Sequence, residues 1–561
     1  MTFSSRISSA MLAAVLGGGA AAQTPNVLLV IGDDMGVDLV NAYHEVTEPN
    51  HTPVIDGLAA EGVLFSNAWA NTVCTPTRAG MMLGRQAFRH GMGRASNDYL
   101  DGIAVDAGDA TLAHAVSPVA TPLALGKWHM HLQVDQPLLH PLRTGFAHYR
   151  GNMALLPGAS IGDGYYQFDK NVDGVMDFST TYSTTDIVND ALELIATTPE
   201  PWFMWVAFNA PHAPFHKPPP ELHTFTLPDN VSSSLMLHMR AMVEAMDTEL
   251  GRLLDTMDPA VRANTLVIFV GDNGTSWQAT VPPFDPDHGK GTLYEGGLNV
   301  PLIVSGPGVV QGAECGALVS ADDLFATIAD AFGVAHEKAL DSVSLWPYLK
   351  DPSLSSLRAT LYSEFFEPPG FGPYTTYDRT VRDAQWKLLH RLSPGVDSLE
   401  LYDLAADPFE QTNLLASELA PDAQAAYDTL LPLLVPAPAP WNAAGYGLYG
   451  AAGFPRLDGE GELLGGDEVS IVITQAAPLA ATTLFVGVDW IAKKFKGGIL
   501  GPSPDVAFAG FVTDEIGNLS LEGHWPAGVP SGFTFYFQAW LVDPAAIAGI
   551  AATNDLIVTA P

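Results

Sequence analysis

The chain has 561 residues, of which 47% are hydrophobic and 16% charged, a composition typical of a folded protein. This length exceeds what one hydrophobic core usually serves, so we expect two or more domains. Acidic residues outnumber basic ones by 62 to 25, and the net charge of −37 argues against nucleic acid and anionic lipid as partners.

The first 22 residues have the pattern of a secretory signal peptide. Arg6 comes early, an apolar run begins at Ala10, and three alanines (20–22) precede Gln23. The run is too short to span a bilayer, and a first core helix, the alternative, would be weakened by the glycines at 17–19. We therefore expect an exported protein, periplasmic or extracellular, with a signal peptide over 1–22 and no membrane anchor.

Four apolar runs predict buried strands, and segments with helical patterns lie between them. Continuous apolar runs indicate strands buried on both faces, as in parallel sheets. Strands that alternate with helices predict an α/β sheet covered by helices on both faces, over residues 23–354. The expected strands are 25–32, 202–208, 264–271 and 301–304, and the expected helices are 54–61, 185–195, 235–257 and 322–332.

From about residue 355 the pattern changes to shorter strands. Residues 380–390 and 399–404 are typical of antiparallel strands, and with a helix near 416–434 they predict a smaller α+β subdomain over 355–435. A Pro-rich and then Gly-rich stretch, 436–466, is expected to be a linker. Six short β-branched and aromatic runs then predict a β-sandwich over 467–561.

Acidic motifs follow two of the expected strands, at the sheet edge where open α/β sheets place their sites. Residues 32–34 read Gly-Asp-Asp, and residues 271–274 read Gly-Asp-Asn-Gly. Together they offer oxygen ligands only, which suit Ca²⁺ or Mg²⁺ rather than zinc. Either motif alone could be turn chemistry. Residues 169–174 also fit the start of a calcium loop, but position twelve is Thr180, so a hairpin turn is expected there.

The most informative stretch is residues 74–85, which reads Cys-Thr-Pro-Thr-Arg-Ala-Gly-Met-Met-Leu-Gly-Arg. This Cys-x-Pro-x-Arg pattern closely resembles the signature of the type I sulfatases. The resemblance implies that a maturation enzyme oxidises Cys74 to formylglycine, an aldehyde whose hydrate is the nucleophile. The alternative is a buried free cysteine, or one that pairs with Cys315, the only other cysteine of the chain.

Further motifs arrive in the order that the sulfatase family predicts. They are Gly-Lys-Trp-His at 126–129, Pro-His-Ala-Pro at 211–214, and a segment from Lys290 to Pro301 that contains Glu-Gly-Gly. Residues 401–414 resemble the C-terminal subdomain of sulfatases. The resemblance covers roughly residues 25–415 and implies a mixed sheet of the alkaline phosphatase-like α/β fold.

The resemblance also implies a role for each site residue. Preorganised cations would offset the charge that develops on the sulfate oxygens, and histidines would transfer protons. One Ca²⁺ ion is implied, with Mg²⁺ the weaker alternative, and its ligands would be Asp33, Asp34, Asp272 and Asn273. The catalytic residues would be Cys74, Arg78, Lys127, His129, His212 and Lys290, with His212 and Lys290 protonating the leaving group and His129 taking the proton whose loss expels sulfate.

The sequence thus predicts a sulfatase that hydrolyses sulfate monoesters, of a sulfated carbohydrate or an aryl alcohol, to the alcohol and inorganic sulfate. Its partners would be that sulfated small molecule or polysaccharide and the maturation enzyme. The first alternative is a phosphonate monoester or phosphodiester hydrolase with the same aldehyde, against which the metal set and the Lys127/His129 pair argue. The second is a catalytically silent glycan-binding protein, which would require Cys74 to remain a thiol.

Substrate specificity is expected to come from loops at 87–105, 275–288 and 365–378. These loops hold Trp277, Phe371 and Tyr374, whose rings could stack on a sugar or aryl group or could serve internal packing. The sequence leaves these two roles open.

Overall fold

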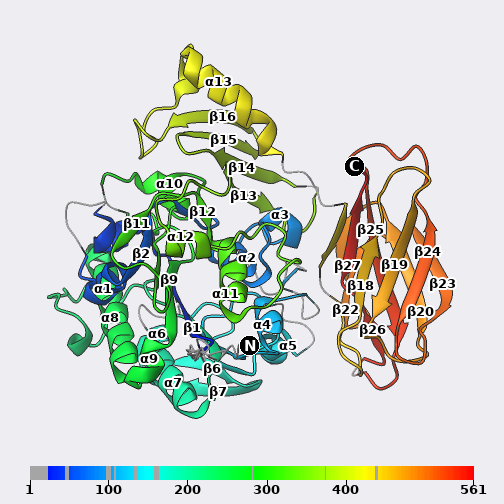
Figure 1. Cartoon of the computed structure of the whole chain (residues 1–561), viewed down its shortest axis with the longest axis horizontal. Coiled ribbons are helices and arrows are strands. Elements are labelled where there is room, and N and C mark those ends of the chain that lie inside the picture. The colour runs from blue at the N-terminus through cyan, green and yellow to red at the C-terminus, as the bar shows by residue number, and fades with distance from the viewer. Residues whose placement is uncertain are drawn as a thin grey trace, which may run out of the picture.

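The computed structural model has a large α/β body, a small subdomain beside it and a C-terminal β module (Figure 1). It describes residues 23–561 except for 45–49, 96–102, 106–108, 132–135, 157–162, 281, 373, 436–439, 446 and 547. The expected signal peptide lies outside the described residues. Among the described helices, none combines the length and apolar character needed to cross a membrane.

A ten-stranded sheet forms the centre of the body, in the order β11-β2-β10-β9-β1-β8-β4-β5-β6-β7. β1 (Asn26–Gly32) pairs in parallel with both β9 (Thr265–Gly271) and β8 (Trp202–Ala207), and β8 pairs in parallel with β4 (Thr121–Gly126). β10 (Leu302–Ser305) runs antiparallel to β9, so the sheet is mixed, and the predicted fold class is confirmed. The remaining strands are β2 (Gly62–Phe65), β5 (His148–Gly151), β6 (Phe168–Val172), β7 (Val175–Ser179) and β11 (Ala313–Cys315).

Helices cover both faces of this sheet. Along β1, Val27, Leu29 and Ile31 pack into one core with α2, α4 and α11, whereas Leu28 and Val30 pack into another with α1, α7 and α8. A strand buried on both faces needs apolar side chains at successive positions, which explains the continuous apolar run. The helices are α1 (Pro53–Ala60), α2 (Cys74–Leu83), α3 (Ala87–His90), α4 (Leu112–Val116), α5 (His140–Arg143), α6 (Asp163–Tyr166), α7 (Ser183–Thr197), α8 (Leu235–Thr256), α9 (Pro259–Ala263), α10 (Glu295–Leu298), α11 (Leu324–Phe332) and α12 (Trp346–Lys350).

Two short pairings complete the body. β6 and β7 form a hairpin that turns at Asp173 and Gly174, as expected for residues 169–174. β3 (Ala68–Trp69) and β12 (Val319–Ser320) pair beside the main sheet.

The small subdomain is an antiparallel sheet with one helix, α13 (Pro421–Leu430), packed on it. Residues 380–390 do not form the single strand that we expected. The Asp383 carboxylate accepts hydrogen bonds from the backbone N–H groups of Gln385 and Trp386, at 2.8 and 2.7 Å, and so forms a tight turn between two strands. The strands are β13 (Leu361–Glu367), β14 (Thr376–Arg382), β15 (Trp386–Ser393) and β16 (Val396–Asp403).

The C-terminal module consists of two facing antiparallel sheets with an apolar core between them. Residues 436–466 are more than the expected linker, because β17 pairs with β27 and β18 pairs with β19. One sheet holds β17 (Trp441–Ala444), β20 (Ala481–Gly487), β23 (Val506–Val512), β25 (Thr534–Val542), β26 (Ile550–Ala552) and β27 (Asp555–Thr559). The other sheet holds β18 (Arg456–Glu460), β19 (Glu468–Thr474) and β24 (Leu519–His524). A separate hairpin is formed by β21 (Trp490–Phe495) and β22 (Gly498–Pro502).

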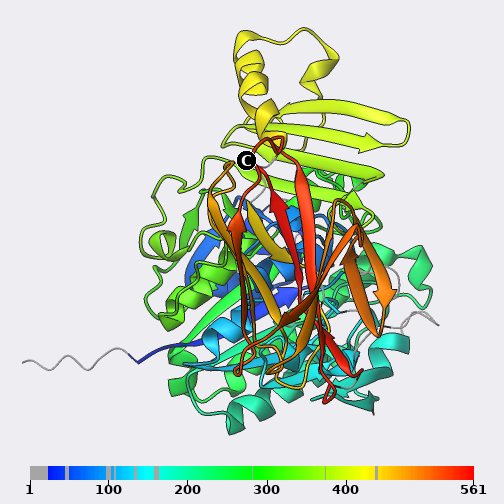
Figure 2. The same cartoon turned by 90° about the vertical axis from the view of Figure 1, so that its right-hand side faces the viewer.

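The module lies beside the body (Figure 1) and faces the viewer in the turned view (Figure 2). Arg85 of the body donates a hydrogen bond to the carbonyl of Ala443 at 3.0 Å, and Asn442 of the module donates one to the carbonyl of Arg89 at 2.9 Å. The rings of Phe371 and Trp490 meet edge to face, 5.6 Å between centroids. These contacts fix the module to the helices that flank the central sheet.

One buried carboxyl group makes the stability of the β module depend on pH. Asp555 accepts a hydrogen bond from the indole of Trp490 at 2.8 Å, and burial raises its pKa to about 7. Because the raised pKa favours the protonated acid in the folded state, its stabilising contribution is complete below pH 4 and is lost as the pH rises to 7. The full loss would be at most about 4 kcal/mol.

We therefore expect Asp555→Asn to flatten the pH dependence of unfolding. Between pH 4 and pH 8 the melting temperature of the wild type should fall more steeply than that of the variant. Thermal unfolding at a series of pH values measures this, with Glu522→Gln on the exposed side of β24 as the control. Identical pH profiles for the wild type and Asp555→Asn would show that Asp555 is ionised in the folded protein.

Candidate active site

The carboxyl ends of four parallel strands bring the predicted site residues to one edge of the sheet. Gly32 at the end of β1 lies opposite Gly271 at the end of β9, and Gly126 of β4 lies opposite Ala207 of β8. The segments that follow are hydrogen-bonded to one another through their backbones, for example from the Asp272 N–H to the Gly32 carbonyl at 3.1 Å. Parallel pairing thus assembles motifs that are up to 240 residues apart in sequence.

Cys74 is the first residue of α2, a helix that is buried along its whole length. Its Sγ lies 3.2 Å from Nδ1 of His129. Cys74 and Cys315 are both free, so the disulfide alternative is not formed. Burial raises the pKa of Cys74, which keeps an unmodified Cys74 as a neutral thiol and therefore a poor nucleophile. Burial, with Lys127 and Arg78 nearby, lowers the pKa of His129 well below its ordinary value, so the imidazole is neutral and can accept a proton.

Arg78, one helical turn after Cys74, ties three segments together. Its Nε and Nη2 lie 2.9 and 2.7 Å from Oδ2 of Asp272, and its Nη1 donates to the carbonyl of Lys127 at 2.8 Å. Burial opposes the charge of Arg78, but Asp272 and Asp33 raise its pKa. The guanidinium therefore stays charged and fixes the start of α2 against the ends of β9 and β4.

Two lysines pair with the two carboxylates that follow β1. Nζ of Lys127 lies 2.6 Å from Oδ2 of Asp33, and Nζ of Lys290 lies 2.5 Å from Oδ1 of Asp34. Burial disfavours the ionised form of Asp33, yet Lys127 and its other cationic neighbours hold the pKa of Asp33 below its ordinary value. Nε2 of His212 lies 3.8 Å from Oδ2 of Asp34.

The structure brings all ten predicted site residues into one connected cluster. Asn273 donates from its amide to Oδ1 of Asp34 at 2.9 Å, and the Asp34 N–H donates to Oδ1 of Asp272 at 3.1 Å. Ligand atoms of Asp33, Cys74 and Asp272 all lie within 4.8 Å of one another. The nucleophile position, the cations and the carboxylates therefore face the same small space.

The acidic part of this cluster fits a hard metal ion. Among the described residues, Oδ1 of Asp33 and Oδ1 of Asn273 are buried and have no hydrogen-bond donor. A buried oxygen without a partner is costly, and both atoms belong to the predicted ligand set. Burial together with the charge of Asp33 also raises the pKa of Asp272. A bound cation would relieve this repulsion between neighbouring carboxylates. Oxygen donors of this kind suit Ca²⁺.

Sequence reasoning missed residues that hold the site loops in place. The hydroxyl of Tyr165 donates to the carbonyls of Asn209 and His212, at 2.6 and 2.7 Å, and so fixes the loop that carries His212. The hydroxyl of Thr275 donates to Asp38 at 2.5 Å and links the two acidic loops. Tyr165 lies in no motif, so the sequence carried no signal for it.

A buried ionic cluster fixes the loop that carries Lys290. Glu295, in the same sequence motif, accepts hydrogen bonds from Lys387 at 3.1 Å and from Arg382 at 3.2 Å, and both cations come from the small subdomain. Lys387 also pairs with Glu410 at 2.8 Å, and the Glu295 N–H donates to Glu410. Lys387 is fully buried, so this cluster anchors the subdomain beneath the Lys290 loop.

Lys387→Met should therefore destabilise the folded chain by about 3–5 kcal/mol, because it leaves two carboxylates buried without their shared cation. Urea-induced unfolding measures this, and Lys350→Met, at the exposed end of α12, is the matched control. Adding Glu410→Gln should restore part of the loss. A loss below about 1 kcal/mol would mean that Glu295 and Glu410 are held by other groups.

Two family models and several known proteins match this chain. Residues 25–334 match the family model described as Sulfatase, and residues 287–431 match the model described as N-sulphoglucosamine sulphohydrolase, C-terminal. Human N-acetylgalactosamine-6-sulfatase is 30% identical over 60% of this chain and 67% of its own length. Bovine arylsulfatase A is 27% identical over 73% of this chain and 87% of its own length. The crystal structure of Ps i-CgsB in complex with k-i-k-neocarrahexaose superposes with a TM-score of 0.61 and 25% identity, and covers 73% of this chain and 92% of that one.

Proposed function

This chain belongs to the sulfatase family of sulfuric ester hydrolases, and on that premise we propose that it releases sulfate from a sulfated carbohydrate through formylglycine formed at Cys74. The observation that carries the proposal is the position of Cys74. It starts a buried helix, and its Sγ lies 3.2 Å from a neutral histidine and within 4.8 Å of carboxylate oxygens of Asp33 and Asp272. We propose that one Ca²⁺ ion is held by Asp33, Asp34, Asp272 and Asn273.

Charge balance supports the metal. The three carboxylates of the cluster are matched by three Lys and Arg side chains, so the side chains alone give no net positive charge. The chain as a whole carries −37, which repels an anionic ester. A divalent cation would make the site positive, and when bound it would stabilise the charge on the sulfate oxygens and acidify the attacking hydroxyl. The residues concerned are Asp33, Asp34, Asp272, Arg78, Lys127 and Lys290.

On the nucleophile side, His129 acts as the proton acceptor. In the mature protein a hydroxyl of the aldehyde hydrate at position 74 would occupy the place where Sγ of Cys74 now lies, beside Nδ1 of His129. Because its pKa is lowered, the His129 imidazole is neutral and can accept a proton from a hydroxyl of the hydrate. Arg78 and Lys127 stay charged despite burial and present cations to the sulfate group.

On the leaving-group side, His212 and Lys290 supply the proton. Both lie beside Asp34, with Nζ of Lys290 at 2.5 Å and Nε2 of His212 at 3.8 Å. His212 is partly exposed, whereas Asp34 is buried, so His212 lies on the solvent side of the metal ligands, where the alcohol would leave. Protonation by these groups offsets the charge that develops on the ester oxygen.

A sulfated sugar is the proposed substrate class. Two similar proteins carry carbohydrate in their descriptions, N-acetylgalactosamine-6-sulfatase and the neocarrahexaose complex. Of the three aromatic residues in the expected specificity loops, Phe371 packs on Trp490 and Tyr374 packs on Phe366. Trp277 is 65% exposed and follows the Asp272–Asn273 loop, which leaves its ring available to stack on a sugar. Export, proposed from residues 1–22, would bring the enzyme to extracellular polysaccharide.

Sulfate release from a panel of sulfated glycans and aryl sulfates tests the proposed function. Protein co-produced with a formylglycine-generating enzyme should release inorganic sulfate, and most from a sulfated carbohydrate. Turnover of a phosphonate monoester without sulfate release would instead assign the phosphonate hydrolase activity. Preference for aryl sulfates over every glycan would overturn the substrate class but not the reaction.

A further inference from the structure

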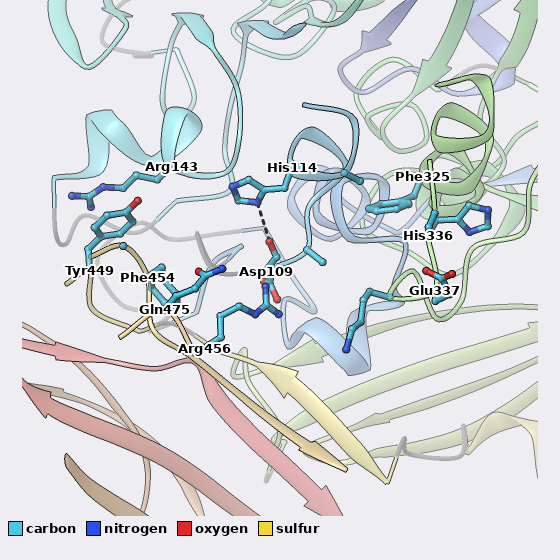
Figure 3. A pocket seen from close by; sticks show the side chains of 15 residues that line it. Asp109, His114, Arg143, Phe325, His336, Glu337, Tyr449, Phe454, Arg456 and Gln475 are labelled. Carbon is cyan, nitrogen blue, oxygen red and sulfur yellow. Dashed lines mark hydrogen bonds between the residues drawn. The ribbon is translucent and has the colours of Figure 1, made fainter. Parts of the chain in front are cut away.

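A cavity of about 520 Å³ lies between the body and the β module (Figure 3). The body contributes His114 of α4, Arg143 of α5 and Lys338, and the module contributes Tyr449 and Arg456. Its volume is that of a small-molecule site, about 300–1,000 Å³, and domain interfaces are a common place for such sites. None of the ten active-site residues lines it.

The charge of this cavity is opposite to that of the chain. Its lining includes three Lys or Arg side chains against Asp109 and Glu337, a net formal charge of about +1. Burial, with Arg456 nearby, lowers the pKa of His114, so that imidazole adds no charge. In the whole chain the acidic residues outnumber Lys and Arg by 62 to 25. Two residues outside the lining pair with charged residues of the cavity: Arg85 lies 3.7 Å from Asp109, and Asp458 lies 3.8 Å from Arg456. A positive cavity on so acidic a protein selects anions.

An arginine and an aromatic ring from the two sides of the junction meet in the cavity. The guanidinium carbon of Arg143 lies 4.4 Å from the centroid of the Tyr449 ring, a cation–π contact that fixes the guanidinium group. Figure 3 shows this pair at one end of the lining and Arg456 nearer to Asp109. Guanidinium groups bind sulfate and carboxylate in a bidentate manner, and aromatic rings line sugar-binding surfaces. The body and the module must both be present for this set to form.

We propose that this cavity is a second, non-catalytic carbohydrate site that binds an anionic sugar unit, sulfated or carboxylated. The β module completes the site and holds one part of a polysaccharide while the catalytic centre acts elsewhere. The proposal does not depend on turnover, because it concerns binding alone.

Binding of dextran sulfate to the full-length Cys74→Ala protein tests the proposal. At physiological ionic strength the net charge of −37 should suppress unspecific association, and uncharged dextran of the same length is the backbone control. Combined replacement Arg456→Gln and Lys338→Gln should raise the dissociation constant by at least about tenfold, because each removes a charged hydrogen-bond donor. The matched control, Lys493→Gln with Lys494→Gln, removes two charges from exposed positions of β21 and should change little.

Several results would overturn the proposal. The affinity could be unchanged in the cavity variant, or fall equally in the control variant, or dextran could bind as well as dextran sulfate. Inorganic sulfate could also displace dextran sulfate when its concentration equals that of the sulfate ester groups. That result would show that the cavity binds anions without recognising a sugar. If Arg456→Gln lowers the melting temperature, the single variant Lys338→Gln replaces the double variant in the binding assay, because Lys338 is exposed and lines the same cavity.

Discussion

Cys74→Ala is expected to lower sulfate release by at least about 10⁴-fold, the order of magnitude for an enzyme that loses its covalent nucleophile. Alanine cannot be converted to an aldehyde, and no other cysteine lies in the site, because Cys315 is in β11 at the far edge of the sheet. Cys74→Ser should be as inactive unless the maturation enzyme accepts serine. Initial rates of inorganic sulfate release measure the effect.

Cys315→Ala is the matched control for this prediction. Both cysteines are buried and free, so each variant removes one buried thiol, from the site in one case and from the hydrophobic core in the other. Cys315→Ala should keep wild-type activity per folded molecule. An active Cys74→Ala protein would rule out the aldehyde mechanism, whatever the substrate.

Asp33→Asn is expected to remove the response of the protein to Ca²⁺ and to lower activity by at least about 10²-fold, the order lost when one preorganised group of a catalytic site is removed. Asp33 pairs with Lys127 through Oδ2, at 2.6 Å, while its Oδ1 has no donor among the described residues. An amide at this position keeps the size but loses the charge that both the lysine and a cation require.

Thermal unfolding with Ca²⁺ or with a chelator separates metal binding from activity. Calcium at about 100 times its dissociation constant should stabilise the wild type by about 3 kcal/mol, and Asp33→Asn by much less. Asp169→Asn, at an exposed position of β6, is the control carboxylate and should respond as the wild type does. Equal stabilisation of all three proteins by Ca²⁺ would place the metal outside the proposed site.

The sequence predicted the sheet and the cluster better than the connections between distant parts. The apolar runs of β1 and β9 were readable because both faces of each strand are buried, and short motifs directly after the strands led to the site. The turn at Asp383 was missed because one polar residue reverses an otherwise strand-like segment. Residues 436–466 were predicted to be a linker because their many Pro and Gly residues are typical of linkers, although the segment contains the two short strands β17 and β18.

Contacts between remote segments leave weaker signals still. Glu295 and Lys387 are 92 residues apart, and nothing in either local pattern indicates that they meet. The module docks partly through backbone carbonyls, such as that of Ala443, which any sequence would offer. Tyr165 likewise acts on backbone carbonyls of the His212 loop. Such contacts depend on the assembled fold, so they emerge only from the structure.

The mass of the peptide that contains Cys74 tests the central claim most directly. It should be measured on protein whose sulfate release has been determined in the same preparation. Conversion of Cys74 to formylglycine replaces sulfur by oxygen, and the converted fraction should rise in proportion to activity across preparations with different amounts of maturation enzyme. Full activity in a preparation whose Cys74 peptide retains its sulfur would contradict the account.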